Sequence, residues 1–196
     1  INEKIINDEK FKNSLNKSYK YLDLDSKLMI LVTGHRRESF SGGFERICKA
    51  ISKIALEFPD VNIVYPVHLN PMVKEPVYKM LSKLNNVHLF EPLDYIDFLY
   101  LMKNSYFILT DSGGIQEEAP SFEKPVLIMR EVTERNEALK SGYAKLVGTN
   151  ENIIYEEASN LLTDSNYYKS MVAFENPFGD GKASQRIANI IANYLS

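Results

Sequence analysis

A glycine-containing turn is the segment of this sequence best suited to bind an anion. Thr110-Asp111-Ser112-Gly113-Gly114 ends an apolar run and opens a stretch of helical period, so main-chain N–H groups and the positive end of a helix dipole point to one spot. The two glycines let a ligand oxygen approach the backbone closely. The pattern predicts a phosphate site at Ser112, Gly113 and Gly114. The alternative is that Ser112 only caps the helix and the glycines only form a tight turn.

The helix dipole contributes about 0.3–2 kcal/mol alone, too little to hold a diphosphate, so cations must help. His35-Arg36-Arg37-Glu38 follows the first apolar run and supplies two guanidinium groups, whose forked N–H donors match phosphate oxygens. Near a phosphate, His35 can carry a proton and stabilise a departing anion. A solvated pair of surface arginines is the alternative interpretation.

A carboxylate one turn beyond the glycines is suited to accept hydrogen bonds from the two hydroxyls of a ribose, as acidic residues do in dinucleotide-binding folds. Glu118 has this position, whereas Gln116 and Glu117 are expected to point elsewhere. The alternative is that Glu117 or Glu118 only favours the start of the helix electrostatically.

Two further segments follow apolar runs and can reach the same crevice. His68 precedes a helix that begins with a proline, although a lone loop histidine is more often structural. Thr133 and Arg135 offer a hydroxyl and a second anion clamp, but the opposite charges around them can instead form ion pairs with one another. His88 lies inside an apolar run and is interpreted as ordinary sheet packing.

These segments are connected by an alternation of strand and helix patterns, which predicts a mostly parallel, doubly wound α/β sheet. The expected strands are 28–33, 61–67, 87–90, 106–110, 126–129 and 145–147, and the expected helices are 44–58, 71–84, 95–104, 114–122, 150–162 and 183–195. In the common strand order 3-2-1-4-5-6, the first and fourth strands are neighbours and ligands bind beyond their carboxyl ends. His35 and Ser112 are therefore expected to lie side by side.

Composition and sequence motifs exclude several classes of protein. The chain has 196 residues and a net charge of −3, which suits one generous domain and disfavours a nucleic-acid partner. No apolar run is long enough to cross a bilayer and no signal-peptide pattern is seen. The lone Cys48, on an apolar helix face, indicates a reducing compartment, and we expect a cytoplasmic protein. The three histidines and one cysteine lack metal-ligand spacing, and P-loop, G-x-S-x-G and G-x-G-x-x-G patterns are absent.

The chain closely resembles the non-hydrolysing UDP-N-acetylglucosamine 2-epimerases, which interconvert UDP-GlcNAc and UDP-ManNAc. The motifs that carry the resemblance lie in order over roughly residues 20–196: TGHRRE (33–38), YPVHLNP (65–71), TDSGGIQEEA (110–119), REVTERNE (130–137), LVGT (146–149) and NPFGDGK (176–182). Two positions depart from the family pattern, with Asn136 where proline is usual and Phe178 where tyrosine is common.

The resemblance implies a Rossmann-like lobe, the carboxy-terminal half of a two-lobed GT-B fold. Residues 1–22 would be a linker helix from the missing amino-terminal lobe, and residues 23–196 the UDP-binding domain with its C-terminal helices. The chain begins with Ile1, and we expect it to be a piece of a longer protein. The family's acidic catalytic residues belong to the other lobe, and intact members commonly form homodimers.

The implied reaction eliminates UDP to give 2-acetamidoglucal and then adds UDP back, without a metal or redox cofactor. His35 would assist at the UDP oxygens as the catalytic residue in this lobe. The implied UDP contacts are Ser112, Gly113, Gly114, Glu118, Arg135 and Phe98. Core packing explains Phe98 equally well. An allosteric second UDP-GlcNAc would contact Arg36, Glu38 and His68 beside His35.

Two other functions fit the same pattern. A GT-B glycosyltransferase shares the fold and a carboxy-terminal donor site, although the His-Arg-Arg-Glu and Thr-Glu-Arg segments favour the epimerase. A non-catalytic UDP-binding module would bind UDP and gain no turnover when the other lobe is supplied.

Overall fold

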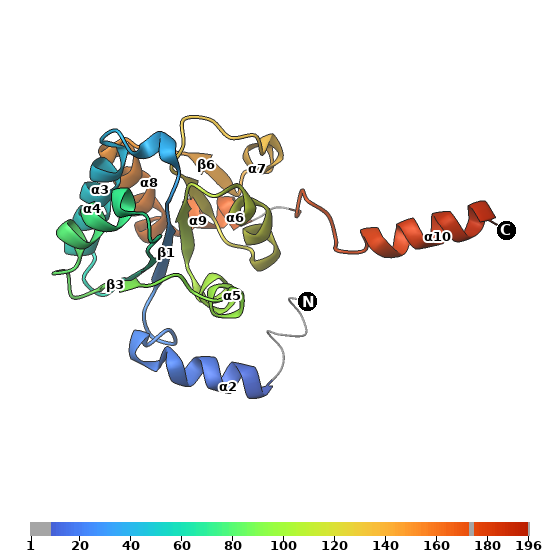
Figure 1. The fold of residues 1–196 in the computed structure, drawn as a ribbon, viewed down its shortest axis with the longest axis horizontal. Helices are drawn as coiled ribbons and strands as arrows, with labels where there is room; N and C mark the ends of the chain where they lie inside the picture. The colour runs from blue at the N-terminus through green and yellow to red at the C-terminus, as the bar shows by residue number, and fades with distance from the viewer. Residues whose placement is uncertain (1–8, 173–174, 196) are drawn as a thin grey trace.

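The computed structural model describes residues 9–172 and 175–195 and contains a parallel sheet between two layers of helices (Figure 1). Its strands are β1 (Met29–Thr33), β2 (Asn62–Pro66), β3 (Val87–Phe90), β4 (Phe107–Thr110), β5 (Val126–Ile128) and β6 (Ala144–Leu146). Their order is β3-β2-β1-β4-β5-β6, and every pair is parallel. This confirms the predicted order, with β1 and β4 adjacent.

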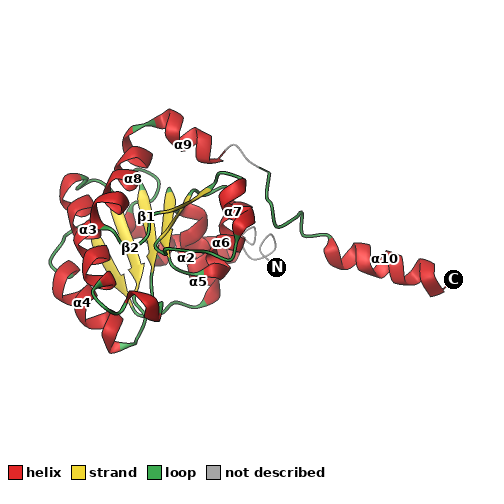
Figure 2. Ribbon diagram, turned by 90° about the horizontal axis from the view of Figure 1, so that it is seen from above, coloured by secondary structure: helices red, strands yellow, loops and turns green. Residues whose placement is uncertain are grey.

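Helices cover both faces of the sheet (Figure 2). One layer consists of α3 (Gly43–Glu57), α4 (Pro71–Leu81), α8 (Glu151–Thr163) and α9 (Ser165–Val172). The other consists of α2 (Glu9–Ser18), η1 (Lys20–Leu22), α5 (Tyr95–Asn104), α6 (Gly113–Glu118), η3 (Ala119–Phe122) and α7 (Asn136–Lys140). A short 3-10 helix, η2 (Arg37–Ser39), follows β1, and α10 (Ala183–Leu195) projects from the body.

The central strands are apolar on both faces because both faces are covered. Every residue of β1 and of β4 is buried, as expected for strands of a parallel sheet inside a three-layer fold. Cys48 lies fully buried on α3, where burial raises the pKa of its thiol to about 12. The position of Cys48 on the apolar face of its helix is thus confirmed.

The helix expected over residues 114–122 is wrong as one element, because it divides at Glu118 into α6 and η3. Pro120 has no N–H group and cannot bond to the carbonyl of Gln116, four residues earlier. The hydroxyl of Tyr143 donates to that carbonyl instead, at 2.5 Å. The Gln116 carbonyl therefore keeps a hydrogen-bond donor although the helix is divided.

Other element boundaries shift slightly. The helix expected to reach residue 84 ends at Leu81, and the strand expected over 145–147 starts one residue earlier. The predicted helices do not include α7 and α9, which have five and eight residues and bury one residue each, Ala138 and Met171.

The segment expected as a linker helix begins outside the described residues, which start at Glu9. Its later part forms α2 and η1, and Tyr19 and Leu22 are 6% and 0% exposed in the core beneath the second layer. The end of this segment is thus anchored on the sheet. A domain boundary at residue 22 stays a prediction.

No helix in the described part of the chain combines the length and the apolar character needed to cross a membrane. Over the same residues, no three His, Cys, Asp or Glu side chains gather as a metal site would require.

Candidate functional site: the carboxyl ends of the central strands

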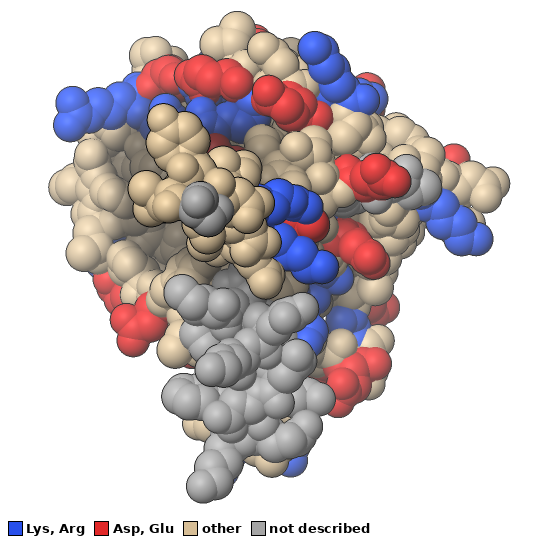
Figure 3. Space-filling model, turned by 90° about the vertical axis from the view of Figure 1, so that its right-hand side faces the viewer, with Lys and Arg blue, Asp and Glu red and all other residues tan. Residues whose placement is uncertain are grey.

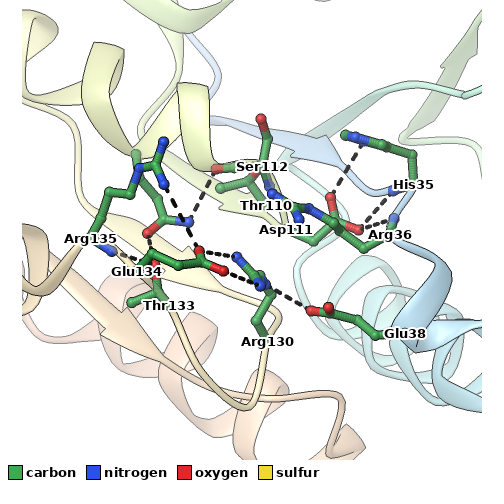
Figure 4. Close-up of polar contacts among 11 residues, drawn as sticks. His35, Arg36, Glu38, Thr110, Asp111, Ser112, Arg130, Thr133, Glu134 and Arg135 are labelled. Carbon is green, nitrogen blue, oxygen red and sulfur yellow. Dashed lines mark hydrogen bonds and ion pairs between the residues drawn. The ribbon is translucent and has the colours of Figure 1, made fainter.

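The loops that follow β1 and β4 are joined by a buried carboxylate. Asp111 directly follows β4, and its Oδ2 accepts hydrogen bonds of 2.7 Å from the main-chain N–H groups of both His35 and Arg36 (Figure 4). One residue earlier, the hydroxyls of Thr33 and Thr110 lie 2.6 Å apart across the two strands. The segments expected to form the two sides of an anion site therefore lie side by side.

The first loop leaves β1 over a tightly packed glycine. A Cβ atom on Gly34 would lie 3.0 Å from the hydroxyl of Tyr65 and 3.3 Å from Phe44. Tyr65 itself is fully buried. Glycine is therefore needed here for packing, and the chain can turn directly toward His35.

The turn after β4 places Ser112 at the N-cap of α6, followed by Gly113 and Gly114. The Ser112 N–H donates to the Thr110 hydroxyl at 3.0 Å, while the Ser112 side chain makes no capping hydrogen bond. Ser112 therefore occupies the N-cap position of α6, but its hydroxyl does not cap the helix. The start of α6 leaves the N–H groups of Gly113 and Gly114 without acceptors within the helix. Gly114 faces open space, since the nearest atom to an added Cβ would be the Ser112 hydroxyl, 3.9 Å away.

Arg135 lies against the first of these glycines. A Cβ on Gly113 would be 3.3 Å from Cζ of Arg135, so glycine at this position lets the guanidinium lie over the turn. The Nε and Nη2 atoms of Arg135 both lie 2.7 Å from Oε1 of Glu117. Glu117 thus points away from Glu118 and its partner Tyr95, as expected, and orients the cation beside the turn.

Arg130 is the buried centre of an ion-pair network whose two carboxylates are exposed. Its side chain is 4% exposed and donates from Nε to Glu38 at 2.7 Å and from both terminal nitrogens to Glu134 at 2.9 and 3.2 Å. These hydrogen bonds raise the pKa of Arg130 and lower that of Glu134 to about 2. The alternative interpretation of this loop, as charges that pair with one another, is thus confirmed for Arg130 and Glu134.

Glu118 ends α6 and faces α5. Its Oε2 accepts a hydrogen bond of 3.1 Å from the hydroxyl of Tyr95, and the side chain is half-buried. Because Glu118 is the last residue of α6, an electrostatic role at the helix start is excluded for it. Phe98, one turn after Tyr95, is partly buried and packs on the core cluster of this layer, so the structure gives it the packing role that was the alternative.

Two of the histidines were predicted to behave differently, and they do. The His68 ring stacks on the His35 ring, with centroids 5.5 Å apart and planes inclined by 19°. His88 bonds through Nε2 to Asn62 at 3.0 Å inside the sheet, and burial lowers its pKa. His68 therefore joins the site, whereas His88 is sheet packing.

Sequence reasoning missed two residues that hold the site together. Asp111 was part of a quoted motif but received no role. Gln116 is fully buried, donates to the carbonyl of Ser112 at 3.1 Å and accepts from the Thr133 hydroxyl at 2.7 Å. This amide ties the turn after β4 to the loop after β5. A signal existed for Asp111, a carboxylate closing an apolar strand, but no local signal connects Gln116 to Thr133.

The arrangement can hold an anion between main-chain N–H groups on one side and His35, Arg36 and Arg135 on the other. Acidic and basic side chains are intermixed on the face of the molecule that Figure 3 shows. This is consistent with the net charge of −3.

Comparison with known proteins identifies the family of this chain. A family described as UDP-N-acetylglucosamine 2-epimerase matches residues 3–192. The chain belongs to the UDP-N-acetylglucosamine 2-epimerase family. A relative from Yersinia pestis, named UDP-N-acetylglucosamine 2-epimerase, is 53% identical over 99% of this chain and 51% of its own length.

Solved epimerase structures share the fold as well. The Neisseria meningitidis UDP-GlcNAc 2-epimerase bound to UDP-GlcNAc superposes with a TM-score of 0.92 at 41% identity, covering 98% of this chain and 52% of that one. S. aureus MnaA, solved with UDP, has a TM-score of 0.87 at 46% identity, with 98% and 52% coverage. The chain thus spans about half the length of these epimerase relatives. The predicted family and the Rossmann-like fold are both confirmed.

Proposed function

We propose that this chain is the nucleotide-binding lobe of an enzyme that interconverts UDP-GlcNAc and UDP-ManNAc through UDP elimination and re-addition via 2-acetamidoglucal. One observation carries the proposal. Asp111 ties the loops after β1 and β4 together, so that His35 and Arg36 lie beside the turn of Ser112, Gly113 and Gly114, in a chain of the epimerase family.

In this proposal the turn binds the diphosphate. The N–H groups of Gly113 and Gly114 and the hydroxyl of Ser112 donate to its oxygens. Helix α6 has only six residues, and a helix dipole contributes at most about 0.3–2 kcal/mol, so the positive charge must come from side chains. Arg135 supplies it over Gly113, and His35 stabilises the UDP that leaves and returns.

The nucleoside would extend toward α5. Glu118 accepts the ribose hydroxyls, and its hydrogen bond from Tyr95 holds the carboxylate at the end of α6. Phe98, on the same helix as Tyr95, contacts the uracil.

A second, regulatory UDP-GlcNAc would bind next to the first, at Arg36, Glu38 and His68. Two contacts support this assignment: His68 stacks on His35, and Arg130 fixes Glu38. The two nucleotide sites would then share the His35 loop.

A second lobe would complete the enzyme and supply its base. Relatives are about twice as long, and α10 carries an uncovered apolar stripe at helical spacing. Its members, all at least 52% exposed, are Ile187, Ile190, Ile191 and Tyr194. Among its residues that the structure describes, α10 buries none and projects from the body (Figures 1 and 2). An apolar stripe of this kind fits docking onto the other lobe. A linker at residues 1–22, a homodimer of the intact enzyme and a cytoplasmic location belong to the same proposal.

Calorimetry with UDP tests the nucleotide site. Ser112→Ala and Glu118→Ala should each weaken binding by about 1–3 kcal/mol, the usual cost of losing a hydrogen bond that involves a charged group. Glu156→Ala, an exposed substitution on α8, is the matched control and should leave the affinity unchanged. Unchanged UDP affinity in both site variants would refute the proposed cradle.

Turnover tests the reaction. The chain alone should release no 2-acetamidoglucal and epimerise nothing, because the base lies in the other lobe, and adding that lobe should restore both activities. A glycoside product that requires an acceptor would instead identify a glycosyltransferase. UDP binding without turnover in the presence of both lobes would leave only a binding module.

A further inference from the structure

Asp111 is a buried carboxylate whose two oxygens have different surroundings. The residue is 0% exposed. Its Oδ2 accepts hydrogen bonds from two successive main-chain N–H groups of the loop after β1, those of His35 and Arg36. This oxygen therefore fixes the backbone that carries the His35 imidazole.

The other oxygen is directed at the imidazole itself. Oδ1 of Asp111 has no hydrogen-bond donor within the described part of the chain and is buried. Nδ1 of His35, which can provide one, lies 3.5 Å away (Figure 4). A buried carboxylate oxygen without a donor is unfavourable, so the environment favours a proton on Nδ1.

His68 does not compete for that proton. Its ring stacks face to face on His35, and its own Nδ1 accepts a hydrogen bond of 3.1 Å from the N–H of Asn70. A neutral His68 therefore carries its proton on Nε2. The contacts of the two stacked rings therefore favour protons on opposite nitrogens.

We propose that Asp111 is a positioning residue that keeps the proton of neutral His35 on Nδ1. When Nε2 takes up a second proton from solvent, Nδ1–H donates to Asp111 and Nε2–H donates to an anionic oxygen of the ligand. The side chain of His35 is 44% exposed, so the ring edge opposite Asp111 can reach a ligand. The identity of that ligand as the diphosphate of UDP rests on the proposed function.

The proton positions can be read directly from nitrogen chemical shifts. Long-range 1H–15N spectra of the 15N-labelled chain are recorded without nucleotide, at a pH chosen so that both rings are neutral. His35 should then show a protonated Nδ1 and His68 a protonated Nε2. In Asp111→Asn, the amide oxygen still accepts the two N–H groups, while its NH2 group faces Nδ1. The His35 proton should then move to Nε2, and His68 should not change.

A matched control is Asp164→Asn. Asp164 also accepts two main-chain N–H groups, from Asn166 and Tyr167 at the start of α9, and lies outside the site. It should leave both histidines unchanged. If Asp111 had only a structural role, Asp111→Asn would alter the stability of the protein without moving the His35 proton.

UDP affinity supplies the functional readout. Asp111→Asn should weaken binding roughly tenfold or more, the size expected when a charge-assisted hydrogen bond is lost, whereas Asp164→Asn should not. A wild-type His35 protonated on Nε2, or a proton that stays on Nδ1 in Asp111→Asn, would overturn the proposal. If that variant does not fold, the wild-type spectrum alone decides. A chain that does not bind UDP would refute the proposed function and leave the proton measurement valid.

Discussion

Two arginines of one loop, five positions apart, occupy opposite kinds of environment. Arg130 is 4% exposed and is enclosed by Glu38 and Glu134, whereas Arg135 is 34% exposed and lies over the glycine turn with Glu117 as its close partner. Residue type and motif are the same for both. The difference lies in the burial and the ion-pair partners of the two side chains. Arg130 stabilises the fold, whereas Arg135 remains accessible to a ligand.

The largest effect should come from substituting the buried arginine, Arg130, and should appear in the free energy of unfolding. Arg130→Met removes three hydrogen bonds to carboxylates and should lower the free energy of unfolding by about 2–3 kcal/mol. This is less than the 3–5 kcal/mol typical of a broken buried pair, because the carboxylates left behind can be hydrated. Urea denaturation measures it. Arg46→Met, an exposed change on α3, is the control, and an equal loss in both variants would contradict the comparison.

On the open side the effect should appear in binding. Arg135→Met should weaken UDP binding by about 1–3 kcal/mol, the cost of one charge-assisted contact, and change the free energy of unfolding by less than about 1 kcal/mol. Calorimetry and urea denaturation together measure both quantities. Lys140→Met, at the exposed end of α7, should change neither. If Arg135→Met destabilised the fold as much as Arg130→Met, the division between the two sides would not hold.

The smallest expected effect is on how the stability of the protein depends on pH. The hydrogen bonds from Arg130 hold the pKa of Glu134 at about 2, below its ordinary 4.5. A lowered pKa in the folded state means that the pair stabilises the protein above about pH 4.5 and that this contribution is lost as the pH falls toward 2. The difference in urea midpoint between wild type and Glu134→Gln should therefore narrow over that range. Glu156→Gln should show no such narrowing, and a constant Glu134→Gln difference would argue against the network.

Much of the fold followed from pattern alone. The apolar strands and the alternation with helices gave the sheet order, and the order brought His35 next to the Ser112 turn. The errors have local causes. Pro120 divides a helix whose apolar pattern continues past it, and α9 is a short helix in which Met171 is the one buried residue.

The site was predicted less completely than the fold. The candidate residues came from motifs, but the contacts that arrange them did not. Glu117 was set aside, yet it holds Arg135; Asp111 received no role, yet it joins the two loops. Such contacts depend on the distance between strands in space, which a local pattern does not encode.

The sequence by itself determined the parallel α/β fold, the glycine turn and the family, because apolar period, backbone freedom and motif order are local properties of a chain. Only the tertiary structure decided which charges pair and which remain open. Glu38 and Arg130 are 92 residues apart, and Asp111 reaches His35 across two strands. Burial changes the strength of each such interaction, and burial exists only once the sheet has brought the loops together.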